Sequence, residues 1–227
     1  VLVKIDPTTE AELARTAAGL TLEMGPCACD STHVYVMCNN AYYRTIRKYL
    51  CSTLAYVATT STWVLGDNIY AICYWAGSVY ATAKWSGNGT WFLRKINCAS
   101  LATTWERTFA SGTGDNQMGG AKGIAPDGAY LYVKDFGTDP RIIRLDMDGV
   151  WVDSFDIAGV LAGGNETAIW CAGNFLFFTS DINGPAARAE QRDKDDLSTS
   201  VATWAMPALL SKQGFLSGDY HYLAIHN

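Results

Sequence analysis

Two tryptophans and an asparagine lie close together in one short segment, as Trp85, Asn88 and Trp91. Indole rings stack on the apolar faces of sugars, and an amide can hydrogen-bond their hydroxyl groups. The segment therefore predicts a carbohydrate-binding hairpin. Segments that are equivalent in the repeat described below carry other residues, although a protein with one sugar site per repeat would repeat them. A carbohydrate-binding module, a lectin, is therefore the alternative functional hypothesis.

Three carboxylates precede segments that we expect to form the innermost strands, namely Asp67, Asp115 and Glu166. Glycoside hydrolysis needs a pair of such groups. Aspartates before strands are also ordinary turn residues, and these three belong to no recognisable motif. A glycoside hydrolase is therefore the less favoured hypothesis. We expect a non-catalytic protein, without a cofactor and without a metal site.

Four of the seven cysteines, Cys27, Cys29, Cys73 and Cys171, also fall on expected innermost strands. If these strands line one central channel, the thiols can approach each other, so the four are candidates for one or more disulfides. Buried free thiols are the alternative, and the spacing is not that of a zinc ribbon. The odd number of cysteines leaves at least one thiol unpaired within a chain.

The cellular location is indicated by several weak signals together. Asn88-Gly89-Thr90 and Asn165-Glu166-Thr167 are glycosylation-type triplets, so Asn88 and Asn165 are candidate glycosylation sites. The cysteine content is high for a cytosolic protein, and the sequence begins with Val1 rather than methionine. We therefore expect an extracellular or cell-surface protein.

Composition excludes several classes of protein. The 227 residues are 49% hydrophobic and carry a net charge of −5. A disordered chain would be less apolar, and a nucleic-acid-binding surface would be basic. Because the net charge is negative, we expect no nucleic-acid partner. No apolar run reaches the length of a bilayer span, so we also expect no membrane span.

An aromatic residue recurs inside a short apolar segment. It recurs in steps of 45, 52, 45 and 45 residues, at Tyr35, Tyr80, Tyr132, Phe177 and Tyr222. A glycine-containing turn precedes four of the five segments, as expected for an antiparallel hairpin. A period of this length is typical of propellers and solenoids.

A second marker, the end of each expected third strand, gives the same count of five. It is found at Lys4-Ile5-Asp6, Lys48-Tyr49-Leu50, Lys95-Ile96-Asn97, Arg144-Leu145-Asp146 and Gln191-Arg192-Asp193. Over its whole length the sequence resembles a five-bladed β-propeller with four-stranded antiparallel blades, forming one domain over residues 1–227. Its length is also similar to that of propeller lectins with five repeats.

The two chain ends are expected to share the closing blade. Residues 214–227 supply its first two strands, and the third strand begins at Leu2. Residues 10–18 have some helix chemistry, with a possible capping box from Thr9 to Glu12. The repeat register instead makes 10–15 the fourth strand, which we favour because tertiary pairing overrides local propensity.

These features favour a structural subunit that assembles with copies of itself, as a filament or a surface layer. A blade shared by both ends can be completed by a second molecule through exchange of the terminal strands. Trp105, Trp151 and Trp204 fall on expected outermost strands, where they either pack between blades or face a partner. The main hypothesis is thus a non-catalytic self-assembling protein, and glycans are partners only in the lectin alternative.

Overall fold

The structure is a computed structural model. It describes residues 2–6, 8–9, 11–16, 23–39, 44–61, 67–85, 87–136, 140–157, 169–179, 188–205, 213–217 and 220–224, the last two ranges as backbone alone. All regular structure in these ranges is β-strand. In the described part of the chain, there is no helix that is long and apolar enough to cross a membrane.

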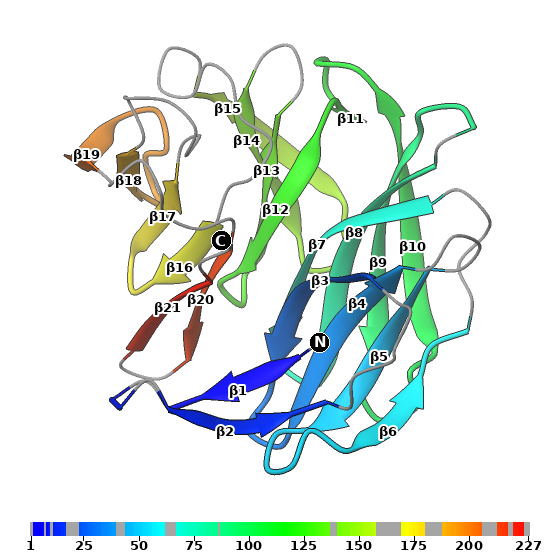
Figure 1. The fold of residues 1–227 in the computed structure, drawn as a ribbon. Coiled ribbons are helices and arrows are strands. Elements are labelled where there is room, and N and C mark those ends of the chain that lie inside the picture. The colour runs from blue at the N-terminus through cyan, green and yellow to red at the C-terminus, as the bar shows by residue number, and fades with distance from the viewer. Residues whose placement is uncertain are drawn as a thin grey trace.

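Four antiparallel meanders form the body of the molecule (Figure 1). In each meander, every strand pairs with the next strand in sequence. The first sheet contains β3 (Glu23–Cys29), β4 (His33–Asn39), β5 (Arg44–Leu50) and β6 (Tyr56–Thr59). The second sheet contains β7 (Asp67–Trp75), β8 (Ser78–Trp85), β9 (Trp91–Asn97) and β10 (Thr103–Ser111), with β11 (Gln117–Met118) parallel to β10.

The third and fourth sheets repeat this pattern. The third sheet contains β12 (Ala121–Pro126), β13 (Tyr130–Asp135), β14 (Arg141–Asp146) and β15 (Trp151–Asp156). The fourth sheet contains β16 (Ile169–Ala172), β17 (Phe175–Thr179), β18 (Arg188–Asp193) and β19 (Ser200–Ala205). Strands of four to nine residues joined by short turns are what alternating apolar patterns between Gly and Asp residues favour.

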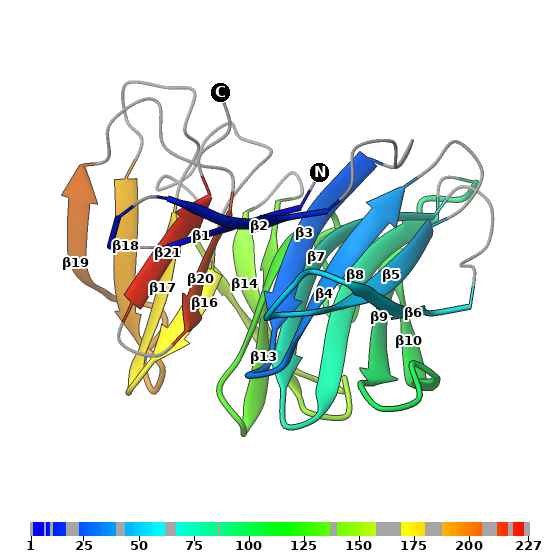
Figure 2. The same ribbon diagram turned by 60° about the horizontal axis from the view of Figure 1, so that its bottom comes forward.

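Two further hairpins lie at the ends of the chain. The N-terminal hairpin pairs β1 (Val3–Ile5) with β2 (Glu12–Arg15), and the C-terminal hairpin pairs β20 (Gln213–Ser217) with β21 (Tyr220–Ala224). The structure thus confirms a strand rather than a helix for residues 12–15. Among the described residues, no pairing joins β1 to β21. In Figure 2 the N-terminal hairpin runs across β20 and β21 rather than along them.

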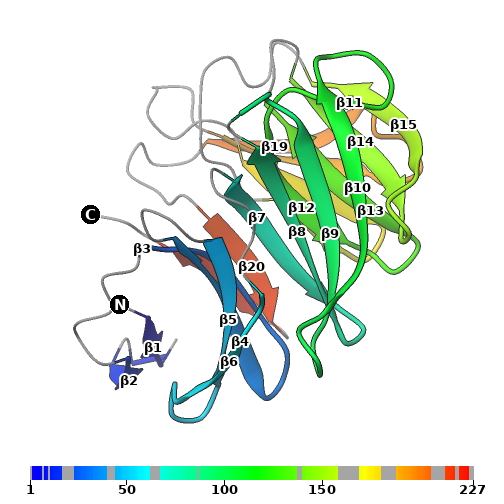
Figure 3. The ribbon, with the colours of Figure 1, turned by 90° about the vertical axis from the view of Figure 1, so that its right-hand side faces the viewer.

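The innermost strands follow one another around a common centre. Strand β7 contacts β3 and β12, and β16 contacts β12 and β20. Figure 3 shows the second and third sheets packed side by side with their strands in the same order. The expectation of an all-β, propeller-like arrangement of four-stranded antiparallel sheets is confirmed. The sheets are partly open where the two terminal hairpins meet, so the structure does not show a closed ring of five complete blades.

A β-bulge marks the same repeat position in every pair of third and fourth strands. On the third strand, the register shifts between the first and the middle residue of the second marker. This occurs at Lys4/Ile5, Lys48/Tyr49, Lys95/Ile96, Arg144/Leu145 and Gln191/Arg192. Bulges of this kind re-aim the strand that carries them. The N-terminal hairpin therefore has the local structure of the outer half of a blade.

The core lies between neighbouring sheets. Tyr35, Tyr80 and Tyr132 are at most 1% exposed. Each belongs to a core cluster that also contains apolar residues of the following sheet. Burying one side chain of this size contributes about 1.5–3 kcal/mol, which explains why an aromatic residue recurs at this position. Phe177, at the same position of the fourth sheet, is only half-buried.

Candidate functional site

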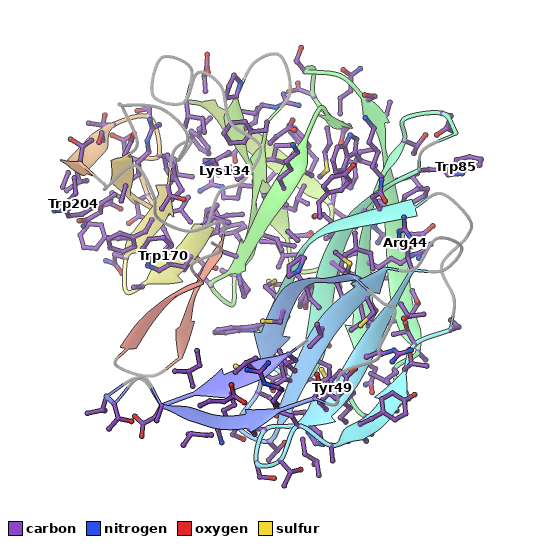
Figure 4. The ribbon with its side chains drawn as sticks, in the orientation of Figure 1. Arg44, Tyr49, Trp85, Lys134, Trp170 and Trp204 are labelled. Atoms are coloured by element: carbon purple, nitrogen blue, oxygen red, sulfur yellow. The ribbon has the colours of Figure 1, made fainter. Side chains whose placement is uncertain are left out.

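The predicted sugar-binding hairpin connects β8 and β9. Trp85 is 38% exposed and projects from the edge of the molecule (Figure 4), but Trp91 is 1% exposed. The Trp91 ring lies 5.1 Å from the ring of Tyr70, and the Lys84 ammonium lies 5.5 Å above it. The prediction for Trp91 is therefore wrong, because residues 91 and 93 of β9 both point into the core. The lectin hypothesis loses one of its two stacking surfaces.

Asn88 stabilises the turn of the same hairpin. Its side-chain oxygen accepts a hydrogen bond of 2.9 Å from the backbone N–H of Thr90, which closes the turn. Gly89 follows with a φ of +76°, a conformation that favours glycine. Asn88 is exposed, so its glycosylation stays a prediction. Asn165, the other candidate, lies outside the described residues.

The three candidate carboxylates do not form a described pair. Asp115 lies in the exposed turn between β10 and β11. Asp67 begins β7, with its backbone alone described, and Glu166 lies outside the described residues. The geometry therefore gives no separation between two carboxylates on which a glycoside hydrolase could be argued.

All seven cysteines are free thiols, including the disulfide candidates Cys27, Cys29, Cys73 and Cys171. The disulfide prediction is therefore not met in the structure, which agrees with the alternative of buried free thiols. Cys27 and Cys29 are two residues apart on β3, near the limit of the separation that a disulfide allows. Cys73 and Cys171 influence each other electrostatically, but they belong to the second and fourth sheets, with β12 contacting both strands.

Burial determines the chemistry of these thiols. It raises the pKa of Cys27 to about 11 and that of Cys171 to about 12, and it raises the pKa of Cys73 as well. These cysteines are therefore protonated at neutral pH and pack as small apolar side chains. Within the described ranges, no group of three His, Cys, Asp or Glu residues is arranged to hold a metal ion.

A carboxylate at the end of the first sheet binds a tyrosine of the core. Asp30 accepts hydrogen bonds from the backbone N–H groups of Thr32 (2.6 Å) and His33 (2.7 Å) and from the Tyr35 hydroxyl (2.8 Å). Desolvation by burial opposes ionisation of Asp30, but these hydrogen bonds outweigh it and lower the pKa to about 2. Asp30 is therefore a charged acceptor that fixes both the turn and Tyr35.

The third sheet has an equivalent carboxylate, Asp127, which also binds a turn and a core tyrosine. Asp127 accepts hydrogen bonds from the Tyr130 backbone N–H (2.8 Å) and the Tyr132 hydroxyl (3.0 Å). The ammonium group of Lys194, from the fourth sheet, lies 3.2 Å from the same carboxylate. The second sheet has Trp75 at this position instead. The arrangement is thus present in two of the three sheets compared, and in the third sheet it also joins the neighbouring sheet through Lys194.

Basic residues of the third strands also reach the following sheet. Lys48 lies opposite Tyr35 and donates to the Cys98 carbonyl at 2.8 Å. Arg144 lies opposite Tyr132 and donates to the Lys194 carbonyl at 3.4 Å. In both cases the acceptor is 50 positions further along the chain, in the turn between the third and fourth strands of the next sheet. These contacts explain the basic residue of the second marker.

A buried ion pair holds the loop between β10 and β12. Asp135 is fully buried, accepts hydrogen bonds from the N–H groups of Gly119 (2.9 and 3.0 Å) and Gly120, and pairs with the Arg141 guanidinium at 3.3 Å. Burial raises the pKa of Asp135, while the N–H groups and Arg141 act in the opposite direction. Arg141 also donates to the Gln117 carbonyl at 2.8 Å. This pair therefore positions backbone.

Further buried charges lie between the third and fourth sheets. Lys134 is fully buried between them (Figure 4), and its ammonium donates to the Thr179 carbonyl. Glu190, 1% exposed, accepts a hydrogen bond of 2.6 Å from Arg192. Arg192 also donates to the Leu197 carbonyl. Lys134 and Arg192 thus join the third and fourth sheets, since Arg192 also donates to the Asp156 carbonyl at 3.5 Å.

The outer-strand tryptophans separate into two kinds. Trp105 and Trp151 pack against the core cluster between the second and third sheets. Trp204, on β19, is 46% exposed and stacks on Phe177 at 6.3 Å between ring centroids. Phe177 stacks in turn on Trp170 of β16 at 5.4 Å. Sequence spacing alone could not separate these cases, because what covers each ring is a neighbouring sheet.

Comparisons with known proteins give the fold but no family. No family model matches the chain, and no curated protein matches it. A crystal structure of a protein of unknown function from Bacteroides caccae superposes with a TM-score of 0.59 at 10% identity, over 88% of this chain and 67% of that chain. A prolyl endopeptidase structure gives 0.55 at 11% identity, over 88% of this chain and 28% of that chain. The β-propeller domain of Cps50 (Swd1) from Myceliophteria thermophila gives 0.50 at 9% identity, over 86% and 62%. At these identities the likeness concerns the fold alone.

Proposed function

We propose that this protein is a non-catalytic β-propeller subunit that assembles with copies of itself. In this proposal, the N-terminal and C-terminal hairpins are the outer and inner halves of a fifth blade, and each half is completed by the other half from a second molecule. The observation that carries the proposal is that both halves are present as separate two-stranded sheets, with no pairing between β1 and β21.

The N-terminal hairpin lies against the first sheet as an outer half-blade should. Leu2 packs on the cluster of Val36, Cys38 and Tyr49. Lys4 interacts electrostatically with Cys51, which lies in the turn between β5 and β6. The equivalent turns of the second and fourth sheets accept hydrogen bonds from Lys48 and Arg144. The hairpin also carries the repeated bulge.

The C-terminal hairpin supports the other half of the proposal. Strand β20 contacts β16, as each innermost strand contacts the innermost strand of the preceding sheet. Strand β21 then presents an edge that pairs with no other strand in the described ranges. Unpaired edges of this kind readily accept a strand from another chain.

Exchange of the half-blades between molecules gives an extended assembly. A head-to-tail contact forms a ring if the rotation between subunits closes, and otherwise a filament. A filament or surface layer, at the extracellular or cell-surface location inferred from the sequence, is the form we propose. The carbohydrate-binding alternative rests on the exposed face of Trp85 alone, so we do not argue it further.

The proposal is tested by measuring molar mass as a function of protein concentration. Sedimentation velocity and light scattering should show species heavier than the 24.7 kDa monomer, increasing with concentration. Electron microscopy of the concentrated sample should show regular assemblies. A monomer at every concentration would overturn the proposal.

A further inference from the structure

One apolar residue of the N-terminal hairpin is exposed at a position that is buried in every other sheet. Ile5 is 55% exposed. The residues that follow the same bulge in the four sheets are between 0 and 4% exposed, and they are Tyr49, Ile96, Leu145 and Arg192. In the second and third sheets, this residue belongs to the core cluster shared with the preceding sheet. Ile5 thus occupies the position that packs against the preceding sheet elsewhere, but its side chain is exposed.

Leu13, on the partner strand β2, shows that exposure of the whole hairpin is not the cause. Leu13 is 56% exposed, and it is the extra residue of the bulge. The extra residues of the other bulges are exposed too: Val57 and Val152 are each 43% exposed and Val201 is 54% exposed. Exposure is therefore ordinary at the position of Leu13 and exceptional at that of Ile5.

The sheet that precedes the shared blade has a partly exposed aromatic face. Trp170, Phe177 and Trp204 form a stack that crosses the fourth sheet from its innermost to its outermost strand (Figure 4). Trp170 and Phe177 are half-buried, and Trp204, on the outermost strand, is 46% exposed. We call these three residues the aromatic face.

The third sheet shows how such a face can be covered. Phe155 and Trp204 have the same pairing position: Phe155 lies opposite Ile142, which pairs with Lys134, and Trp204 lies opposite Ala189, which pairs with Thr179. Lys134 and Thr179 each follow the repeated aromatic residue by two positions. Phe155 packs into a cluster with Leu176 and Phe178 of the following sheet. On the fourth sheet, the main contact of β20 in the described part of the chain is with β16, at the inner end of the aromatic face. The outer end is the place where the third and fourth strands of the next blade belong.

We propose that the outer end of the aromatic face, at Phe177 and Trp204, binds the Ile5 side of β1 from a second copy of this chain. This inference rests on the proposed self-assembly and names its contact surface. The occupant follows from continuity with the contact between β16 and β20, because β1 and β2 are the strands that extend that blade outward. It also joins two apolar groups. Ile5 is exposed at a position that is buried in the four full sheets, and Trp204 is exposed at a position where Phe155 of the third sheet is half-buried.

Four variants test this contact by sedimentation velocity. Ile5→Glu and Trp204→Ser should each weaken self-association by at least about tenfold, since each removes a large apolar contact. Leu13→Glu is the matched control for Ile5→Glu, and Tyr56→Ser, at a residue that is 56% exposed on β6, is the control for Trp204→Ser. Both controls should associate as the wild type does. Circular dichroism and thermal unfolding check that all four variants fold.

The outcomes separate this inference from the proposed function. If the wild type associates and both Ile5→Glu and Trp204→Ser associate equally well, the contact proposed here is wrong and self-assembly stands. If Leu13→Glu weakens association as much as Ile5→Glu, the contact is also wrong, because both sides of the hairpin would then matter. If the wild type is monomeric at all concentrations, the proposed function itself is wrong, and this inference is wrong with it.

Discussion

Single carboxylates in this protein do the work of joining turns to core tyrosines. Asp30 and Asp127 each close a turn through backbone N–H groups and accept a tyrosine hydroxyl with the other oxygen. A hydrogen bond to a charged acceptor is stronger than one between neutral groups, and a buried hydroxyl without a partner is costly. The same two carboxylates therefore contribute to both local structure and contacts between sheets.

Replacing Tyr132 by Phe tests this contribution. The change removes the hydroxyl that lies 3.0 Å from Asp127 and leaves the ring in the core. We expect the free energy of unfolding to decrease by about 1–2 kcal/mol. Tyr56→Phe is the control, because Tyr56 is 56% exposed, and its effect should stay within about 0.5 kcal/mol. Equal effects of the two changes in urea unfolding would contradict this interpretation.

The low pKa of Asp30 predicts how its contribution depends on pH. The folded-state pKa of about 2 lies below the ordinary value near 3.9, so the stabilisation is complete above about pH 4 and is lost as the pH falls toward 2. Asp30→Asn keeps an acceptor for the turn and removes the charge. Its deficit in unfolding free energy, relative to the wild type, should therefore shrink between pH 4 and pH 2. A deficit that stays constant over this range would show that the charge contributes nothing.

The residue-level predictions from the sequence failed where burial depends on distant segments. From the sequence, the indole rings of Trp85 and Trp91 are equally suited to stack on a sugar. In the structure, Trp91 begins β9 on the side that faces the core. The alternation of Trp91 with Leu93 was the available signal. Asp135 and Arg141 are cross-strand partners in the β13–β14 hairpin, but no sequence signal identifies their contacts with the loop before β12, because a local pattern does not place that loop.

At the scale of elements, the loop between β10 and β12 is fixed by a close backbone approach. A Cβ atom on Gly120 would lie 2.7 Å from the carbonyl carbon of Phe136, and the Gly120 N–H donates to Asp135. Since main-chain atoms cannot move aside as a side chain can, the loop is held against β13 only because residue 120 is glycine.

Replacing Gly120 by Ala should therefore destabilise the protein. We expect a loss of about 1–3 kcal/mol, the usual cost of forcing an added methyl group into a packed site. Gly87→Ala is the control, because its nearest neighbour would be the Trp85 ring at 3.4 Å and the position is exposed. Thermal unfolding of both variants measures the difference. A Gly120→Ala protein as stable as the control would contradict the close approach.

Strand order and repeat register could be predicted from the sequence because they depend on local patterns. The aromatic residue of the second strand and the marker of the third strand both appear at the expected positions, and residues 12–15 form the expected strand. The relation between the two terminal hairpins could not be predicted in this way. It depends on pairing between strands more than 200 residues apart, for which side-chain alternation gives no register.

At the scale of the whole molecule, the sheets form a propeller-like series that is partly open. A core cluster fills each of the three spaces between consecutive full sheets. The N-terminal hairpin and the fourth sheet expose Ile5 and Trp204 respectively. In the contact proposed above, these two apolar surfaces face each other across the interface between two molecules.

Mixing two defective variants tests whether that interface forms between molecules. Ile5→Glu has a damaged hairpin and an intact aromatic face, whereas Trp204→Ser has an intact hairpin and a damaged aromatic face. Each alone should sediment as a monomer. A mixture should form a one-to-one pair, because the hairpin of the Trp204→Ser chain can still bind the aromatic face of the Ile5→Glu chain.

The pair should not grow further, since the remaining hairpin and the remaining aromatic face are both damaged. A mixture of Leu13→Glu with Tyr56→Ser should instead assemble like the wild type. If the first mixture sediments as two separate monomers, the hairpin does not pass between molecules. Closure of the fifth blade within one chain would give that result, because each defect would then stay confined to its own molecule.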